Sequence, residues 1–509
     1  MASRILGVVR EQVLASLFGA SDAMDAYNVA YRVPNLLRDL FAEGAMSAAF
    51  VPTFARDLTT NGKASAFRLG ANVLNALLVI TAVLVLLGLL FADPLVALFA
   101  GGYATVPGKL QLTGQLTRIM LPFLTFVALA AAFMGMLNAL GHFFIPALSP
   151  AMFNVVNVLC AVALVPFMPA LGLPPVAGIA IGTLLGGVAQ WAIQWPLLHR
   201  EGFRYTPRLD WSDPGLRRVL LLMGPGTIGL AATQVNVFVN TLLATGQAAG
   251  AVSWLNYAFR LMYLPIGLFG VSIATATTPV IARLAAQSDQ GAVRKTIADG
   301  LTLMLMLNVP ATVGLAALAQ PIVQLMYERG AFVQADTLAT AAALQFYAIG
   351  LLGYSVVRIA SPAFYALEQN RIPVAISIVT VLVNAGLNTI LVRWMGYEGL
   401  ALGTSIAALL NAGLLLLMLS RHLDGLEGRR VLDSLIRIIV ASAVMGLAAV
   451  GLDRMLLSAL PGSRLAPQLL RLGISIGGAV AVLALTAHLL RIKEFGDGVA
   501  LVMRRLGRR

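Results

Sequence analysis

The sequence predicts an all-α polytopic membrane protein with about fourteen transmembrane helices, and three observations lead to this fold class. Of its 509 residues 59% are hydrophobic, only 11% are charged, and the mean hydropathy is +0.86. A soluble domain carries about 25% charged residues. Uncharged stretches such as 73–92 and 161–198 can cross about 30 Å of hydrocarbon as helices. They do not alternate apolar and polar residues, as the strands of outer-membrane barrels do.

The apolar stretches divide into fourteen predicted spans, each bounded by polar, Gly-rich or Pro-rich connections. In chain order they cover 1–19, 24–56, 68–99, 113–140, 144–168, 174–198, 216–245, 250–283, 294–326, 338–367, 372–394, 398–421, 433–458 and 466–491.

Basic residues gather in the loops that follow even-numbered spans and in the tail. The loops after the second and sixth spans, with the adjoining span ends, hold Arg56, Lys63, Arg68, Arg200, Arg204, Arg208, Arg217 and Arg218. By the positive-inside rule both termini are expected in the cytoplasm, and an even number of crossings agrees. The formal charge of +13 then reflects loops that face anionic phospholipids, so we expect no nucleic-acid partner.

The chain repeats itself at a spacing of 227 or 228 residues (279 − 52 = 227; 256 − 28 = 228). Matched positions include Asn28 with Asn256, Arg32 with Arg260, Pro52 with Pro279, Pro146 with Pro373, and Asn157 with Asn384. Each repeat holds six spans, so both begin on the same side of the membrane. We therefore expect two parallel six-helix lobes at 1–200 and 215–421, with an additional helix pair at 433–491 and a substrate site between the lobes.

Ionisable residues at membrane depth cost about 2.5–3.5 kcal/mol each on insertion scales, so they face a cavity or a partner. They concentrate in the first, second and eighth spans. The candidate cavity-lining and gating residues are Arg4, Arg10, Glu11, Asp25, Arg32, Arg38, Glu43 and Arg260. For Arg4 and Asp25 the alternative is a position at the membrane interface, where a long side chain reaches water.

Several arginines around one cavity favour an anionic cargo, because guanidinium groups bind phosphate oxygens in pairs. An exporter of organic cations would need carboxylates instead. The four histidines lie near predicted helix ends, and the sequence holds no His/Cys cluster, phosphate-cradling Gly-rich loop or nucleophile–base pair. We therefore predict a transporter with no catalytic residue, no metal site and no cofactor.

A set of motifs stands at Ser3-Arg-Ile-Leu-Gly7 with Arg10, Asp25-Ala-Tyr27, Pro34-Asn-Leu-Leu-Arg38, Phe41-Ala-Glu-Gly-Ala45, Phe50-Val-Pro52 and Tyr257-Ala with Arg260-Leu and Pro265. These motifs resemble the MurJ (MviN) lipid II flippases, a family of the multidrug/oligosaccharidyl-lipid/polysaccharide exporter superfamily. The resemblance covers nearly the whole chain, and the block from Pro34 to Ala45 is specific.

The resemblance implies a function in the bacterial inner membrane. Lipid II, the undecaprenyl-diphosphate-linked peptidoglycan precursor, would be loaded from the cytoplasm and released to the periplasm by alternating access. The family's cavity residues correspond to Arg4, Arg10, Asp25, Arg38 and Arg260, which would contact the diphosphate and sugars or gate access. The last two helices would hold the polyprenyl tail, and the cell-wall synthesis machinery is a candidate partner.

Three features depart from the family pattern. The chain begins at Met1, about a dozen residues later than its relatives, which shortens the first span and suggests a misassigned start or a truncation. Phe259 stands where many relatives carry Asp or Asn, which removes a charge partner for Arg260. The seventh and eleventh spans offer only asparagines where sodium-coupled relatives have carboxylates. This argues against sodium coupling and leaves drive by the membrane potential open.

Three other functions are weighed against the flippase. Another exporter of the superfamily would carry a different lipid-linked oligosaccharide or a drug. A non-transporting cell-wall scaffold would gain nothing from the insertion cost of the arginines. A polytopic glycosyltransferase would need a long periplasmic loop for its catalytic domain, and none is present in the predicted topology.

Overall fold

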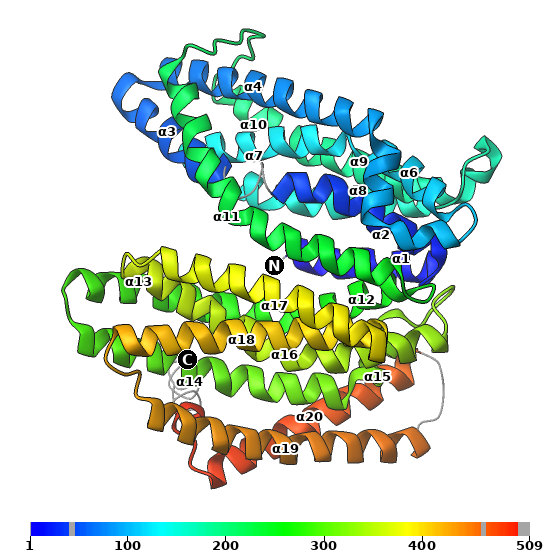
Figure 1. Cartoon of the computed structure of the whole chain (residues 1–509), viewed down its shortest axis with the longest axis vertical. Coiled ribbons are helices and arrows are strands. Elements are labelled where there is room, and N and C mark those ends of the chain that lie inside the picture. The colour runs from blue at the N-terminus through cyan, green and yellow to red at the C-terminus, as the bar shows by residue number, and fades with distance from the viewer. Residues whose placement is uncertain (1, 40–45, 460–464, 497–509) are drawn as a thin grey trace. The chain divides into compact units, whose positions relative to one another are not determined.

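The computed structural model describes residues 2–39, 46–459 and 465–496. Within these ranges all regular secondary structure is helical and no strand occurs (Figure 1). The predicted all-α membrane class is therefore confirmed.

Packing divides the chain into two compact units, each described here by itself. Unit 1 comprises Met1–Ser253 and the short segment Arg329–Phe332, and unit 2 comprises Trp254–Glu328 and Val333–Arg509. The predicted lobe boundaries come from the sequence repeat. A division by packing does not test them, and they stay predictions.

Unit 1 is a bundle of long helices joined by short connections (Figure 1). Its helices are α1 (Ala2–Phe18), α2 (Asp22–Arg38), α3 (Met46–Asn61), α4 (Lys63–Leu90), α5 (Ala92–Phe99), α6 (Lys109–Met120), α7 (Phe123–Ala139), α8 (Phe144–Leu164), α9 (Ala177–Ala192), α10 (Trp195–Arg200) and α11 (Pro214–Thr245), with 3₁₀ turns at Gly101–Thr105, Val165–Phe167 and Pro169–Leu171.

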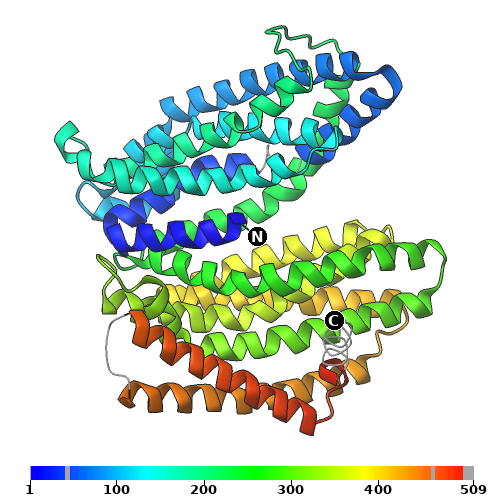
Figure 2. The same ribbon diagram turned by 180° about the vertical axis from the view of Figure 1, so that it is seen from behind.

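Unit 2 is a second helical bundle, seen from behind in Figure 2. Its helices are α12 (Ala251–Pro265, whose first residues belong to unit 1), α13 (Val271–Ala286), α14 (Gln290–Ala317), α15 (Ala319–Tyr327), α16 (Gln334–Ala366), α17 (Arg371–Met395), α18 (Tyr397–His422), α19 (Gly428–Ala459) and α20 (Leu465–Leu489). A π-helical turn, Ile266–Gly270, joins α12 to α13 directly after Pro265, where the proline ring removes a backbone donor from the helix.

Eleven helical segments of the described residues are long and apolar enough to cross a membrane. They match eleven of the fourteen predicted spans in order, from Lys63–Leu90 to Leu465–Leu489. The other three predicted spans, 1–19, 24–56 and 216–245, fall on α1, on α2 with α3, and on α11. The number fourteen therefore stays a prediction, while the multi-spanning architecture is confirmed.

The helices repeat at the spacing found in the sequence. Helix α4 and helix α14 each have 28 residues, and both ends are shifted by 227 positions (290 − 63 and 317 − 90). Helices α8 and α17 also begin 227 residues apart (371 − 144). In both repeats the next helix packs closely against this one, as α9 against α8 and α18 against α17.

Local capping explains where several helices begin. The hydroxyl of Ser21 accepts a hydrogen bond from the amide of Met24 at the start of α2. The carboxylates of Asp213 and Asp289 cap α11 and α14 in the same way. Such caps satisfy amides that lack partners in the first helical turn.

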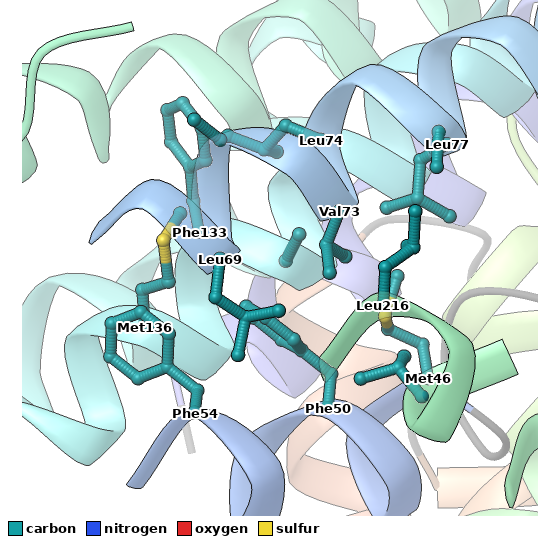
Figure 3. Packing of buried hydrophobic residues seen from close by; sticks show 14 of the residues in the cluster. Met46, Phe50, Phe54, Leu69, Val73, Leu74, Leu77, Phe133, Met136 and Leu216 are labelled. Atoms are coloured by element: carbon teal, nitrogen blue, oxygen red, sulfur yellow. The ribbon is translucent and has the colours of Figure 1, made fainter. Parts of the chain in front are cut away.

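The core of unit 1 brings together α3, α4, α7 and the first turn of α11 (Figure 3). Phe50 and Phe54 of α3 pack with Leu69 and Leu74 of α4, and Leu216 reaches the same cluster from α11. Burying an aromatic or leucine side chain contributes roughly 1.5–3 kcal/mol. This contact explains why α11 belongs to unit 1 by packing.

The C-terminal pair α19 and α20 packs against α14 and α15 within unit 2. A largely buried ion pair joins the two helices: Arg471 Nε lies 3.0 Å from Asp453 Oδ1. Arg471 Nη2 also donates to Gln324 Oε1 of α15 at 3.3 Å. The pair is therefore attached to unit 2 by polar contacts as well as by apolar packing.

Candidate functional site

Asp25 of α2 is almost completely buried, and its carboxylate is the centre of a polar cluster in unit 1. Lys109 Nζ, at the start of α6, donates to Asp25 Oδ2 at 3.0 Å and to Asp22 Oδ1 at 2.7 Å. The same ammonium group lies 4.1 Å from the ring centroid of Tyr103. Lys109 is thus a buried cation held by two carboxylates and one aromatic face.

The first turn of α12 supplies the other donors to Asp25. The amides of Gly250 and Ser253 donate to Oδ2 and Oδ1 at 2.8 and 2.9 Å, and the Ser253 hydroxyl donates to Oδ1 at 2.7 Å. A carboxylate at a helix N-terminus is stabilised by the unpaired amides and by the helix dipole. Asp25 therefore caps α12 from another helix and holds the last residues of unit 1 before the chain enters unit 2.

A second contact joins the last turn of α1 to the segment 329–332. The amide of Ala331 donates to the carbonyl oxygen of Ser16 at 2.9 Å. Gly19 and Gly330 both have positive φ, +57° and +59°, and a Cβ on Gly330 would lie 2.2 Å from the Ser16 oxygen. Only glycine fits this backbone contact without a shift.

Arg10 and Glu11 form a buried ion pair on α1. Arg10 Nη2 donates to Glu11 Oε1 at 2.6 Å, and the guanidinium carbon lies 5.3 Å from the ring centroid of Phe153. On the next helix, α2, Tyr27 stacks on Tyr31. Arg10 itself is buried. Arg10 is therefore enclosed in the bundle of unit 1 in this state of the protein.

The remaining predicted residues of unit 1 are more accessible. Arg38 donates to Asp39 Oδ1 through Nε and Nη2 at 3.2 and 2.9 Å, and Gln234 of α11 reaches Asp39 Oδ2 at 3.4 Å. Arg4 is exposed and Arg32 is partly buried. The candidate Glu43 lies outside the described residues.

Arg260 lies on α12 in unit 2 and is exposed there. Its neighbour Phe259 packs among Tyr263, Tyr347 and Tyr354, with ring centroids 5.5–6.2 Å apart. Phe259 therefore fills an aromatic cluster where a carboxylate or amide would need a polar partner.

A pocket of about 550 Å³ opens beside this aromatic cluster in unit 2. Tyr263, Tyr354 and Tyr365 line it together with Arg358 of α16, and Arg358 Nη2 donates to the Tyr263 hydroxyl at 2.5 Å. Aromatic faces with one guanidinium suit a ligand that carries both sugar rings and phosphate.

Sequence reasoning missed Lys109 and Arg358. The insertion-cost argument used for Arg260 applies equally to Arg358, which stands in the middle of the predicted span 338–367. Lys109 lies between the predicted spans 68–99 and 113–140, and its pairing with Asp25 could not be predicted from the sequence because 84 positions separate the two residues.

The asparagines considered for ion coupling pair with one another. Asn240 Nδ2 donates to Asn236 Oδ1 at 2.7 Å, and Asn388 Nδ2 donates to Asn384 Oδ1 at 3.0 Å. Among the described residues no group of three His, Cys, Asp or Glu side chains could hold a metal ion.

A second polar cluster lies at the end of unit 1 where α4 begins. Glu201 accepts from Lys63 Nζ at 2.7 Å and lies 2.8 Å from His142 Nε2. These contacts lower the pKa of the Glu201 carboxyl below its usual range, and the hydrogen bond from Lys63 has the largest effect. With 28 residues, α4 is roughly 42 Å long, which separates this cluster from the Asp25 cluster along the bundle.

Comparison with known proteins places these features in one family. The family model described as lipid II flippase MurJ matches residues 14–469. A Vibrio cholerae protein named "Probable lipid II flippase MurJ" is 34% identical over 454 residues, which cover 87% of this chain and 85% of that one. A Burkholderia cenocepacia protein named "Lipid II flippase MurJ" is 34% identical over 426 residues, 83% of this chain and 82% of the relative.

Solved structures agree with the sequence relatives. A lipid II flippase MurJ in an inward closed conformation has a TM-score of 0.78 and 26% identity, with 96% of this chain and 97% of that chain covered. An inward-facing multidrug MATE transporter of the MOP superfamily has a TM-score of 0.69 at 17% identity, covering 84% of this chain and 96% of that one, which shows the shared fold alone.

Proposed function

The chain belongs to the lipid II flippase MurJ family, and on that premise we propose that it moves lipid II across the bacterial inner membrane by alternating access. The observation that carries the mechanism is the Asp25 cluster, which holds the first turn of α12 at one end of unit 1. Family membership favours this function over an unrelated exporter, a scaffold or a glycosyltransferase.

The substrate we propose is an anionic amphiphile, and arginines supply its recognition. Arg4 on α1, Arg260 on α12 and Arg358 on α16 are exposed within their units, so a diphosphate can reach their guanidinium groups. Each guanidinium can donate two parallel hydrogen bonds to phosphate oxygens. The tyrosines beside Arg358 would stack against the sugars of the head group.

Arg10, Glu11, Arg32 and Arg38 of unit 1 take part in substrate recognition at different stages in this proposal. The Arg10–Glu11 pair is buried here, so Arg10 would meet the substrate only after α1 moves or Glu11 releases it. Arg38 is held by Asp39 and would exchange that carboxylate for a phosphate. Such exchange of one charged partner for another keeps a membrane-depth charge compensated throughout.

Asp25 acts as a gate residue in this mechanism. By the distribution of basic loops, its end of unit 1 faces the periplasm and both chain termini face the cytoplasm. To open that end, the start of α12 must withdraw its three hydrogen bonds from Asp25, and Gly330 must separate from Ser16. A substrate can drive this change only through tighter binding to the open state, so its contacts with the arginines must differ between the two states.

We propose that the membrane potential, and no resident cofactor or sodium ion, supplies the energy. The asparagine pairs of α11 and α17 bring amide oxygens together without a carboxylate, and hard cations favour carboxylate oxygens. We further propose that α19 and α20 hold the polyprenyl tail. Anionic phospholipids would surround the basic loops, and the cell-wall synthesis machinery would receive the product.

Charge reversal tests the role of the arginines. In cells depleted of the native protein, Arg260→Glu and Arg358→Glu should fail to restore growth, whereas Arg393→Glu, an exposed arginine outside the site, should restore it. Immunoblots of membranes must show equal amounts of each variant. Full growth with both Arg260→Glu and Arg358→Glu would exclude these side chains from substrate recognition.

A further inference from the structure

A cavity of about 940 Å³ opens at the end of unit 1 where α3 meets α4, remote from the Asp25 cluster. Its walls are the end of α3, the start of α4, the segment 206–213 and the start of α11. Four arginines line it: Arg56, Arg68, Arg208 and Arg218. They come from four different parts of the chain and converge only in the folded protein.

The guanidinium groups of these four arginines have no ion pair or hydrogen bond within the described part of the chain. The three carboxylates of the cavity accept hydrogen bonds from neighbouring amides or hydroxyls and not from the arginines. Asp57 Oδ1 accepts from Asn61 at 2.6 Å and from Ser65 at 3.3 Å. Asp210 accepts from the Ser212 amide at 2.8 Å, and Asp213 caps α11. The aspartates therefore stabilise local turns and form no ion pair with the four arginines in the described residues, and four arginines against three aspartates leave the cavity a net positive charge.

Two buried asparagines fix the segment that carries Arg208. Asn72 exchanges two hydrogen bonds with the backbone of Asp210, at 2.9 and 2.8 Å. Asn75 donates to the carbonyl oxygens of Thr206 and Arg208 at 2.8 and 2.9 Å, and it accepts from the Tyr205 hydroxyl at 2.6 Å. Buried amides that satisfy a connecting segment in this way make it part of the folded structure.

The floor of the cavity is equally well defined. Leu69 and Leu216 belong to the apolar core of Figure 3. A Cβ on Gly215 would lie 2.7 Å from a methyl carbon of Leu69, so the first turn of α11 approaches α4 closely. The exposed arginines therefore extend from a packed base, which fixes the backbone positions from which they can reach a ligand.

Topology alone does not account for this arrangement. The positive-inside rule requires basic residues in the loops at this end, and any scattered positions would satisfy it. It does not require four guanidinium groups around one cavity in which none of them pairs with a carboxylate. The cavity has more arginines than aspartates, and a bound anion would offset this excess of positive charge.

We propose that this cavity binds a phosphate-bearing anion with at least two phosphate or equivalent oxyanion groups. One phosphate uses one or two guanidinium groups, so four arginines and 940 Å³ suit a larger anion. The site is distinct from the transport site proposed above and does not depend on it.

Two sources offer this chemistry. Trp211, Leu221 and Leu222, next to the cavity in sequence, expose 47%, 76% and 50% of their surface, as expected where a cavity borders the lipid interface. An anionic phospholipid head group could therefore enter from the bilayer. A soluble phosphorylated molecule could enter from the aqueous side.

The test uses the full chain in nanodiscs, with the double variant Arg208→Gln/Arg218→Gln. The matched control is Arg200→Gln/Arg429→Gln, which removes the same charge from two exposed arginines outside the cavity. Calorimetric titration with inorganic pyrophosphate in phosphatidylcholine nanodiscs measures the soluble source. Native mass spectrometry of protein from phosphatidylglycerol-containing nanodiscs measures the retained lipid.

We expect the Arg208/Arg218 variant to weaken binding of one probe by about tenfold or more, and the control to stay within about twofold. If loss of Arg208 and Arg218 weakens pyrophosphate binding, the ligand is a soluble anion. If it reduces only the retention of phosphatidylglycerol, the ligand is a lipid head group. The proposal is overturned if the two variants behave alike with both probes, including the case in which neither probe binds.

Circular dichroism and thermal unfolding check the fold of each variant. If the glutamine pair does not fold, Arg208→Lys/Arg218→Lys replaces it, because lysine keeps the charge and loses the paired donors. This variant should weaken binding about threefold or more, and unchanged affinity would also overturn the proposal.

Discussion

Ser253 donates two hydrogen bonds to the carboxylate of Asp25, one from its amide at 2.9 Å and one from its hydroxyl at 2.7 Å. Ser253 is the last residue of unit 1 before the chain continues into unit 2 at Trp254. The contact therefore holds the first turn of α12 against α2. In the proposed mechanism it must break in every transport cycle.

The Asp25–Lys109 pair should be strongly coupled in the free energy of unfolding. Replacing Asp25 by Asn leaves the buried Lys109 without its inner carboxylate, and breaking such a pair costs about 3–5 kcal/mol. The double variant Asp25→Asn/Lys109→Met should be destabilised less than the sum of the single variants. Denaturant unfolding of the purified protein measures all three, and strict additivity would contradict the pairing.

Substitution of Gly330 should open the contact with Ser16. In Gly330→Ala the new methyl group would clash with the Ser16 carbonyl oxygen, in addition to the cost of positive φ, roughly 1–2 kcal/mol. Gly172→Ala is the control, since Gly172 has φ +70° and open space around it. Hydrogen exchange at the Ala331 amide should accelerate in Gly330→Ala alone. Equal exchange rates in both variants would mean that backbone strain at positive φ, and not the contact with Ser16, causes the change.

The Glu201 cluster should stabilise the protein at neutral pH and cease to do so in acid. Its carboxyl has a lowered pKa in the folded protein, so the unfolded chain binds the proton first as the pH falls. The contribution is complete above the ordinary glutamate pKa of about 4.3 and is lost as the pH falls through the folded-state value. Wild type should unfold at a higher temperature than Glu201→Gln at pH 7, and the difference should persist down to about pH 4.3 and shrink below it. A difference that grows on acidification would refute the assignment.

Removing one partner of the ion pair between the C-terminal helices should destabilise the protein more than removing both partners. Arg471→Leu leaves Asp453 uncompensated and should lower the thermal stability markedly, by about 3–5 kcal/mol if the site stays dry. Arg471→Leu/Asp453→Leu should recover most of the loss, because two apolar side chains can pack in the same place. Failure of the second substitution to restore stability would show that Arg471 acts mainly through Gln324.

Much of the fold could be predicted because membrane spans depend on composition over about twenty residues. The pair α4 and α14 illustrates this: the apolar runs and the 227-residue spacing were visible in the sequence, while the equal length of 28 residues comes from the structure. The boundaries of spans that contain charged residues were harder to predict. The second predicted span, 24–56, combines α2 and α3, with residues 40–45 between them outside the described ranges.

The candidate site could be predicted only in part, because insertion cost identifies charges but not their partners. Asp25 and Arg10 were singled out, yet Lys109 and Phe153, which contact them, are distant in sequence. Arg358 was missed although the same cost applies to it. The cavity around Arg208 depends on Asn72 and Asn75, whose role appears only when the segment 206–210 folds back on α4.

The most direct test of the proposed function measures lipid II at the outer surface of cells. A membrane-impermeant enzyme that cleaves lipid II reports the accessible fraction in depleted cells that express wild type, Arg260→Glu or no copy of the protein. Wild type should restore accessibility, while Arg260→Glu and the empty control should leave the precursor inside. Equal accessibility in all three strains, with the protein present in the membranes of the first two, would contradict the flippase function.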